Sequence, residues 1–343
     1  MRIAGLFAAI ALALAGYTAY WFHLAGWAED GIEARLAAWR DAGYTVSHSD
    51  LSIGGFPYRI EASLSDLAIA APDGETRWSW RAPLLVLVVQ PWDLRHWIAI
   101  SDQASTASLT ADGGALSLEA RPETVWASLV LDEDFTARRA VLDIKGLELR
   151  HAGRLDMVRA ERVQLHARRP ETAAERHLGT ALRIDVVLRV DALDLSDGDM
   201  GPLGSRIETV ALDASLLGPL PRSGDRGAIA AWRDAGGTID VHRLELLWGP
   251  VEMNAEGTVA LDAEFRPIGA LTAEIEGVDA VIDGFKRLGT LGDMGAEAAK
   301  FVLGLMSETR AGDGARVVTL PLTAQDGQLY LGPVPIAPLS PLF

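Results

Sequence analysis

The alternation of apolar and polar residues between positions 237 and 277 constrains the fold more than any other feature of this sequence. Apolar residues recur at every second position through four consecutive segments, and Gly or Pro separates each segment from the next. In an extended chain, successive side chains point to opposite faces, so residues two apart lie on the same face. A helix would instead scatter these apolar residues around its axis. The pattern therefore predicts a β-meander with one apolar and one polar face. The alternating apolar residues are Leu244, Leu246, Trp248, Val251, Met253, Ala255, Val259, Leu261, Ala263, Phe265, Leu271, Ala273 and Ile275.

The apolar face of this meander needs a cover, and a second sheet, a helix or a lipid would each provide one. No other stretch of the chain shows an equally long partner pattern. We therefore expect the face to form a groove that binds or conducts lipid or another long apolar molecule. The rival expectation is that helices near the C-terminus or a second sheet fill the face and that nothing else binds there. The candidate groove residues are Val259, Leu261, Phe265, Leu271 and Ile275.

Composition narrows the classes of function. The chain has 343 residues, enough for one large β-rich domain or two smaller ones, and 49% of them are hydrophobic, which is ample for a core. Its formal net charge of −16 argues against nucleic acid as a partner, and solubility explains this charge. The absence of cysteine excludes disulfides, thiolate nucleophiles and cysteine-ligated metals.

The N-terminal segment is apolar over a length that fits a membrane. Residues 3–28 contain no Asp, Glu, Lys or Arg, and as a helix they would span about 39 Å, against a hydrocarbon core of about 30 Å. Aromatic residues gather toward the far end of this segment, as in the belt that meets lipid headgroups, and Arg2 precedes it. We expect an uncleaved, single-pass anchor in the inner membrane, with the bulk of the chain in the periplasm. The alternative is a signal peptide cleaved before Gly16, because Ala13-Leu14-Ala15 fits the small-x-small pattern.

The rest of the chain is predicted to be β-rich with a few short helices. Residues 29–42 have the spacing of a short amphipathic helix, and residues 281–288 and 298–306 have that of two helices after the meander. Strands are expected through most of residues 44–195, and Asp326-Gly327 predicts a hairpin turn. The predicted fold class is mainly β (β-rich α+β), with a curved antiparallel meander sheet whose concave face is apolar.

The predicted organisation has three parts. Residues 1–28 form the anchor or signal peptide, and residues 29–217 form a first β-rich region. Residues 218–343 contain the closing meander, the two helices and the final hairpin. The boundary before residue 218 rests on the Gly- and Pro-rich segment 218–227, which has the composition of a linker or loop.

The sequence contains no motif for nucleophilic catalysis, nucleotide binding or metal-dependent hydrolysis. No two of the seven histidines have ligand spacing on a recognisable element. The acidic residues are scattered over the predicted polar faces of strands, where solubility explains them. We therefore expect a protein that is not an enzyme, with no catalytic residues, no cofactor and no metal site.

A set of short motifs follows the apolar N-terminus and is distinctive in combination: Gly54-Gly55-Phe56-Pro57-Tyr58-Arg59, Ala160-Glu161-Arg162-Val163-Gln164-Leu165-His166, Leu246-Leu247-Trp248-Gly249-Pro250, Gly257-Thr258-Val259-Ala260-Leu261-Asp262, Arg266-Pro267-Ile268-Gly269 and Leu331-Gly332-Pro333-Val334-Pro335. With these motifs the chain resembles, over most of its length, the Gram-negative envelope family called domain of unknown function 2125. That family implies no activity and no catalytic residues. The closing meander also resembles the C-terminal strands of membrane-anchored AsmA-like proteins. This second resemblance implies a curved sheet whose concave apolar face carries phospholipid acyl chains.

The sequence thus predicts a membrane-anchored periplasmic protein that binds an apolar ligand and contributes to envelope maintenance. Its expected partners are the inner membrane, through the N-terminal helix, and a phospholipid or other apolar molecule, but no nucleic acid. The alternative is a non-enzymatic structural or interaction scaffold of the cell envelope, with protein partners and no ligand. An apolar trough would support the first interpretation, and a closed sandwich without a cavity would support the second.

Overall fold

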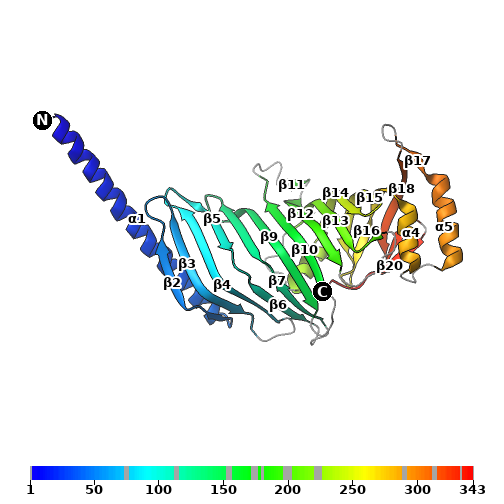
Figure 1. Ribbon diagram of the computed structural model, residues 1–343, viewed down its shortest axis with the longest axis horizontal. Helices are drawn as coiled ribbons and strands as arrows, with labels where there is room; N and C mark the ends of the chain where they lie inside the picture. The colour runs from blue at the N-terminus through cyan, green and yellow to red at the C-terminus, as the bar shows by residue number, and fades with distance from the viewer. Residues whose placement is uncertain are drawn as a thin grey trace. The chain divides into compact units, whose positions relative to one another are not determined.

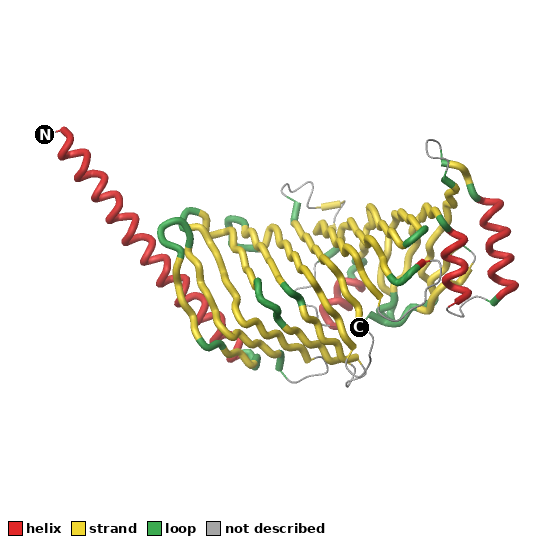
Figure 2. Tube along the Cα trace, viewed as in Figure 1, coloured by secondary structure: helices red, strands yellow, loops and turns green. Residues whose placement is uncertain are grey.

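The structure, a computed structural model, describes residues 2–72, 77–111, 116–151, 157–170, 177–178, 181–195, 203–219, 226–287, 292–310, 315–332 and 334–342. Antiparallel strands account for more than half of these residues (Figure 1, Figure 2). The predicted mainly β class with one long apolar N-terminal helix is therefore confirmed. The chain divides into two compact units, Met1–Asp156 and Met157–Phe343.

The described elements of the first unit are α1 (Arg2–Asp41), β1 (Thr45–Ser47), β2 (Asp50–Gly54), β3 (Ile60–Ala70), β4 (Arg77–Gln90), β5 (Asp93–Ser101), β6 (Thr106–Ala111), β7 (Leu116–Arg121), β8 (Thr124–Leu131) and β9 (Ala137–His151). The strands β1 and β2 both pair with β3, and β3 pairs with β4. From β4 the sheet continues through β5 and β8 to β9. A second path, through β6 and β7, also joins β4 to β9.

The described elements of the second unit are β10 (Met157–Arg168), β11 (His177–Leu178), β12 (Ala181–Leu195), β13 (Arg206–Leu217), α3 (Arg226–Asp234), β14 (Thr238–Trp248), β15 (Val251–Leu261), β16 (Pro267–Glu276), α4 (Val278–Arg287), α5 (Asp293–Met306), β17 (Glu308–Thr309), β18 (Arg316–Gln325), β19 (Gln328–Leu331) and β20 (Val334–Pro338). The predicted meander over residues 237–277 is confirmed as β14, β15 and β16, each antiparallel to the next. The sheet continues from β14 through β13 and β12 to β10, and from β16 through β18 and β19 to β20.

This pairing changes the predicted organisation of the chain. Strands that precede residue 218 pair with strands that follow it, since β13 pairs with β14. The chain divides after Asp156, and not before residue 218 as the sequence predicted. The two helices predicted after the meander are present as α4 and α5. Asp326-Gly327 forms the predicted turn, with positive φ at both residues.

The helix α1 replaces two separate helices predicted from the sequence over residues 3–28 and 29–42. No Pro interrupts the segment, so its hydrogen-bond ladder continues past Gly26 and Gly31. The second half of α1 runs along the sheet of its own unit, and the first half projects beyond the strands (Figure 1). The packed side chains of α1 are Trp21, Leu24, Ala25 and Ala28, against Ile60 and Val89, and Leu36, against Val46, Leu64, Leu67 and Ile69.

The last turn of α1, the last turn of α3 and the corner after each have the same seven residues, Ala-Ala-Trp-Arg-Asp-Ala-Gly, at positions 37–43 and 230–236. The final glycine has a positive φ in both copies, 90° at Gly43 and 81° at Gly236, a conformation that other residues rarely adopt. The next N–H donates to the carbonyl of the Trp, at 3.0 Å in the first copy and 2.9 Å in the second. A strand follows each glycine, so both units use the same helix-to-strand corner.

We expect Gly269→Ala to destabilise the second unit by about 1–3 kcal/mol, because it introduces both a clash and backbone strain. Gly269 has φ 148°, and a Cβ there would lie 2.2 Å from the carbonyl oxygen of Thr258 on β15. Urea unfolding followed by circular dichroism measures the difference. Gly304→Ala is the matched control: Gly304 lies within α5, and the nearest atom to its added Cβ is 3.8 Å away. The free energy of unfolding of the control is expected to rise by up to about 1 kcal/mol. Equal effects of the two variants would contradict the expected clash at Gly269.

Candidate functional site

The structure brings four of the five candidate groove residues onto one face of the sheet in the second unit. Val259 and Leu261 lie on β15 opposite Gly269 and Pro267 of β16. Leu271 and Ile275 continue the same face of β16, because residues two apart on a strand point to the same side. Leu271 and Ile275 are buried in the core, and Val259 packs against it.

Phe265, the fifth candidate, is not among the residues of the core cluster that contains Leu271 and Ile275. It sits in the turn between β15 and β16, with φ 63°, and the guanidinium groups of Arg226 and Arg233 lie 4.7 and 4.6 Å from its ring centroid. The turn is fixed by Asp262, whose Oδ1 accepts hydrogen bonds from the N–H groups of Glu264 (2.9 Å) and Arg266 (2.8 Å). The turn ends the alternation after Leu261, so the period of two does not assign a face to residue 265.

Two helices cover part of the apolar face. Ile282 of α4 and Ala299 and Leu303 of α5 are buried in the same core cluster as Leu271 and Ile275. The face also extends across β18, where Leu320 and Val318 lie directly opposite Ala273 and Ile275. The sequence is compatible with a second sheet, a helix or a lipid as the cover of this face. Over these strands the cover consists of helices.

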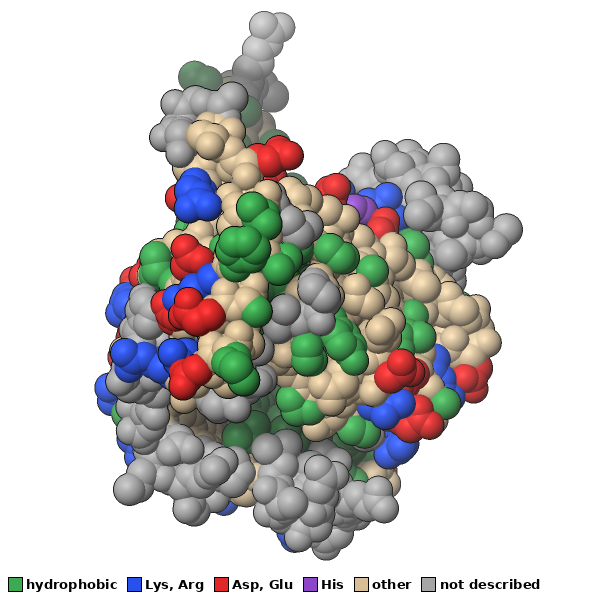
Figure 3. Space-filling model, turned by 90° about the vertical axis from the view of Figure 1, so that its right-hand side faces the viewer, with side chains coloured by type: hydrophobic (Ala, Val, Ile, Leu, Met, Phe, Trp, Pro, Cys, Tyr) green, Lys and Arg blue, Asp and Glu red, His purple; other side chains and the backbone are tan. Residues whose placement is uncertain are grey.

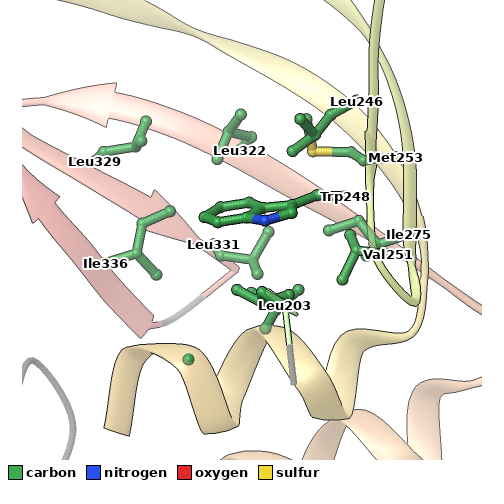
Figure 4. A pocket seen from close by; sticks show the side chains of 12 residues that line it. Leu203, Leu246, Trp248, Val251, Met253, Ile275, Leu322, Leu329, Leu331 and Ile336 are labelled. Atoms are coloured by element: carbon green, nitrogen blue, oxygen red, sulfur yellow. The ribbon is translucent and has the colours of Figure 1, made fainter. Parts of the chain in front are cut away.

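The cover is incomplete, and it leaves an apolar cavity of about 220 Å³. The cavity lies between the sheet and α4, which contributes Val281 and Gly284, and the indole of Trp248 extends into its middle (Figure 4). Segments far apart in the chain build the lining, from the loop before β13 to the last strand, β20. The lining residues are Leu203, Leu246, Trp248, Val251, Met253, Ile275, Val281, Gly284, Leu322, Leu329, Leu331 and Ile336.

The lining is suited to an apolar ligand. Its side chains are hydrocarbon or thioether, apart from the indole of Trp248. That indole N–H already donates to the carbonyl oxygen of Gly204 at 3.1 Å. A ligand in this cavity would therefore be held by hydrophobic burial and shape, without charge recognition.

Ile275 is the only one of the five candidates that lines the cavity. Leu246, Trp248, Val251 and Met253 carry the same alternating signal on β14 and β15, so the pattern had identified them as members of the face. The signal gave no means of ranking them above Val259 or Leu261. Two other lining residues were missed altogether: Leu203 lies outside any strand, and Ile336 lies in a proline-rich segment with no long alternation.

A polar network on β12, β13 and β14 is centred on two buried residues, Asp185 and Ser215. The Ser215 hydroxyl donates to Asp185 at 3.0 Å and lies 2.8 Å from Nε2 of His242. Ser215 is only 2% exposed, and Arg168 and Arg183 also hydrogen-bond the Asp185 carboxylate. The hydroxyl is thus enclosed and held between its two partners, which suits a structural network better than a nucleophile. Within the described ranges, no group of three or more His, Asp or Glu side chains is arranged to hold a metal ion.

The charged partners of Asp185 set its protonation. Burial acts to raise the pKa of this carboxyl, but hydrogen bonds from Arg183 and Ser215 and the charge of Arg183 outweigh it and hold the pKa below its ordinary value. The carboxylate therefore stabilises the folded chain above its ordinary pKa. This contribution is lost as the pH falls through the lowered pKa of the folded state.

Comparison with known proteins gives one family. A family described as "Uncharacterized protein conserved in bacteria" (DUF2125) matches residues 21–340. No curated protein and no solved structure matches the chain.

We expect Asp185→Asn to lower the free energy of unfolding at neutral pH by about 1–3 kcal/mol, because charge-assisted hydrogen bonds to a buried carboxylate are lost. The difference from the parent should shrink as the pH falls below the ordinary carboxyl pKa toward the lowered one, and urea unfolding over a pH series measures it. Asp194→Asn is the control: its exposed pair with Arg206 should contribute less than about 1 kcal/mol. A difference between Asp185→Asn and the parent that stays constant down to acid pH would contradict the assignment.

Proposed function

We propose that this chain, which belongs to the DUF2125 family of uncharacterised bacterial proteins, is a membrane-anchored binding protein. Its proposed ligand is a lipid acyl chain or a similar apolar molecule, held in the cavity of the second unit. The proposed protein is a binding protein and not an enzyme. The proposed place of action is the cell envelope, with the sheet units on the periplasmic side of the inner membrane.

The observation that carries the proposal is the entirely apolar lining of the cavity between β14–β20 and α4. An engineered apolar cavity of about 150 Å³ in another protein stays dry and binds benzene. The cavity here, at about 220 Å³, is larger than that one. It is smaller than the roughly 300–1,000 Å³ of pockets that hold whole drug-sized ligands. We therefore propose that it takes a segment of one acyl chain, with the rest of the lipid outside.

Helix α1 supports the anchoring part of the proposal. It is the one helix among the described residues that is long and apolar enough to cross a membrane. Its residues 3–16 are exposed. Arg2 precedes the apolar segment, and a positive charge at this end favours retention of the N-terminus in the cytoplasm. This orientation would put both units in the periplasm.

A second candidate function is a scaffold that binds another envelope protein and no ligand. The observation in its favour is the outer side of α5, where Met294 is 89% and Leu305 74% exposed, with Phe301 and Val302 between them also exposed. Figure 3 views the side of the second unit on which α5 lies, and hydrophobic side chains are visible on that surface. An apolar surface of this kind is typical of a site for a protein partner.

We expect lipid to co-purify with the full-length protein and to be displaced by Gly284→Leu. Gly284 lines the cavity from α4, so an isobutyl group there would occupy ligand space while replacing a helix glycine with a better helix former. Native mass spectrometry with lipid extraction measures the bound lipid per chain. Gly284→Ala is the matched control, because it makes the same gain in helix propensity but fills little of the cavity.

The comparison between the two variants separates binding from folding. Lipid retained by Gly284→Ala and lost from Gly284→Leu, with both variants at least as stable as the parent, would support the cavity as the site. Equal lipid content in both variants would place any bound lipid elsewhere. A parent protein free of lipid would favour the scaffold.

We expect the mature protein to keep its N-terminus and to remain in the membrane fraction after an alkaline carbonate wash. Intact-mass measurement and N-terminal sequencing test this expectation. A mature chain that begins at Gly16 would show that residues 1–15 are a signal peptide. Protease added to spheroplasts should digest the sheet units, and full protection would contradict the proposed orientation.

A further inference from the structure

Hydrogen bonds hold α1 to the first unit at the place where the helix leaves the sheet. Two turns border this place: residues 55–59 between β2 and β3, and residues 91–92 between β4 and β5. The Tyr17 hydroxyl donates to the carbonyl oxygen of Pro57, and the Tyr20 hydroxyl donates to that of Pro91 at 2.8 Å. The Trp21 indole N–H donates to the carbonyl oxygen of Arg59 at 3.0 Å. These three hydrogen bonds tie α1 to both turns.

The second observation is the length of α1 that remains free of the sheet. Residues 3–16 are exposed, and at about 1.5 Å per residue they extend about 21 Å. A transmembrane helix needs about 20 apolar residues to cross a hydrocarbon core of about 30 Å. A span of that length that starts at Ile3 ends at Phe22, beyond the contacts of Tyr17 and Trp21. A helix that crosses the membrane therefore brings both turns to the membrane surface.

The third observation is what these turns display. Phe56 is 50%, Tyr58 75% and Trp92 63% exposed, and Phe22 of α1 is exposed beside them. The Phe22 and Phe56 rings stack with centroids 6.2 Å apart. Single exposed apolar side chains are ordinary, but these four gather around the exit of an apolar helix. We call Phe56, Tyr58 and Trp92 the aromatic rim. Rings with an apolar body and a polar edge are enriched where membrane meets water.

A third turn at the same end of the sheet differs in chemistry. Residues 132–136 join β8 to β9, and the register of His96 opposite Val130 places this turn at the same end as residues 91–92. It also exposes an aromatic side chain, Phe135, but Asp132, Glu133 and Asp134 precede that residue. Three carboxylates are poorly suited to a surface of lipid phosphates. The surface suited to a membrane is therefore the part of this end next to α1.

We propose that the aromatic rim lies in the headgroup region of the membrane that α1 crosses, so that the first unit contacts the bilayer through two turns as well as through its helix. The inference rests on the proposed anchoring. The occupant is a phospholipid bilayer surface, because the rim is continuous with the apolar helix and the helix length fixes its depth. The three hydrogen bonds to α1 would then hold β3 and β4 at a fixed tilt to the membrane.

The test uses single-cysteine variants of the full-length chain, which has no cysteine of its own. A fluorophore is attached at Tyr58→Cys, Trp92→Cys, Ile10→Cys and Gln103→Cys, and each variant is reconstituted into phosphatidylcholine vesicles. Ile10 reports on the membrane span. Gln103 lies just past the far end of β5, about 30 Å from Trp92 at about 3.3 Å per residue, and is the matched exposed control. Quenching is measured with nitroxides placed in the headgroup or in the middle of the acyl chain, and with iodide in the water.

The label at Ile10 is expected to lose fluorescence with the mid-chain nitroxide, and those at Tyr58 and Trp92 with the headgroup nitroxide. The label at Gln103 is expected to respond to iodide alone. If Ile10 is quenched by lipid while Tyr58 and Trp92 behave like Gln103, the rim stays off the membrane and the inference is wrong. If Tyr58 and Trp92 are shielded from iodide without lipid quenching, the rim has another occupant and the inference is also wrong. If Ile10 itself is not quenched by lipid, the anchoring proposal fails and this inference fails with it.

Discussion

Burial of an apolar sheet face is the constraint on which both units depend. Residues such as Leu64 of β3 and Leu320 of β18 are almost completely buried, and each such side chain contributes about 1.5–3 kcal/mol relative to exposure. A sheet cannot provide this burial alone, because its second layer must come from elsewhere in the chain. In the first unit α1 covers part of the face, and in the second α4 and α5 do so. The repeated corner after α1 and α3 directs the chain from helix to strand in both units.

The alternation in the sequence predicted the strands well because each strand has one face toward the core and one toward water, and apolar and polar residues alternate accordingly. It predicted β14, β15 and β16 and placed Leu271 and Ile275 on the buried side. It misplaced Phe265, because hydrogen bonds of Asp262 close a turn there that the spacing of apolar residues does not register. The extent of α1 was also predicted wrongly. The change from an apolar to an amphipathic pattern near residue 28 indicated two helices, but a change in the environment of the side chains does not interrupt the backbone hydrogen bonds of a helix.

The cavity was beyond prediction for a different reason. Its lining comes from the loop before β13, from β14–β16, from α4 and from the strands β18–β20, so it depends on how distant segments pack and not on any local pattern. The same holds for the network of Asp185, Ser215 and His242. These residues are unremarkable on their separate strands and become partners only through the registers of β12 with β13 and of β13 with β14. Local sequence specifies faces and turns, whereas the empty space between layers is a property of the assembled fold.

We propose that the cavity is a binding site and not a packing defect. Unfilled apolar space between packed layers forfeits contacts and costs stability, of which a domain has only roughly 5–15 kcal/mol. Gly284 of α4 lines this space without a side chain to fill it, and glycine is also a poor helix former. An apolar ligand that binds only the folded chain restores the missing contacts and stabilises the fold in proportion to its occupancy. A glycine that faces an apolar space within a helix is therefore consistent with a space kept for a ligand.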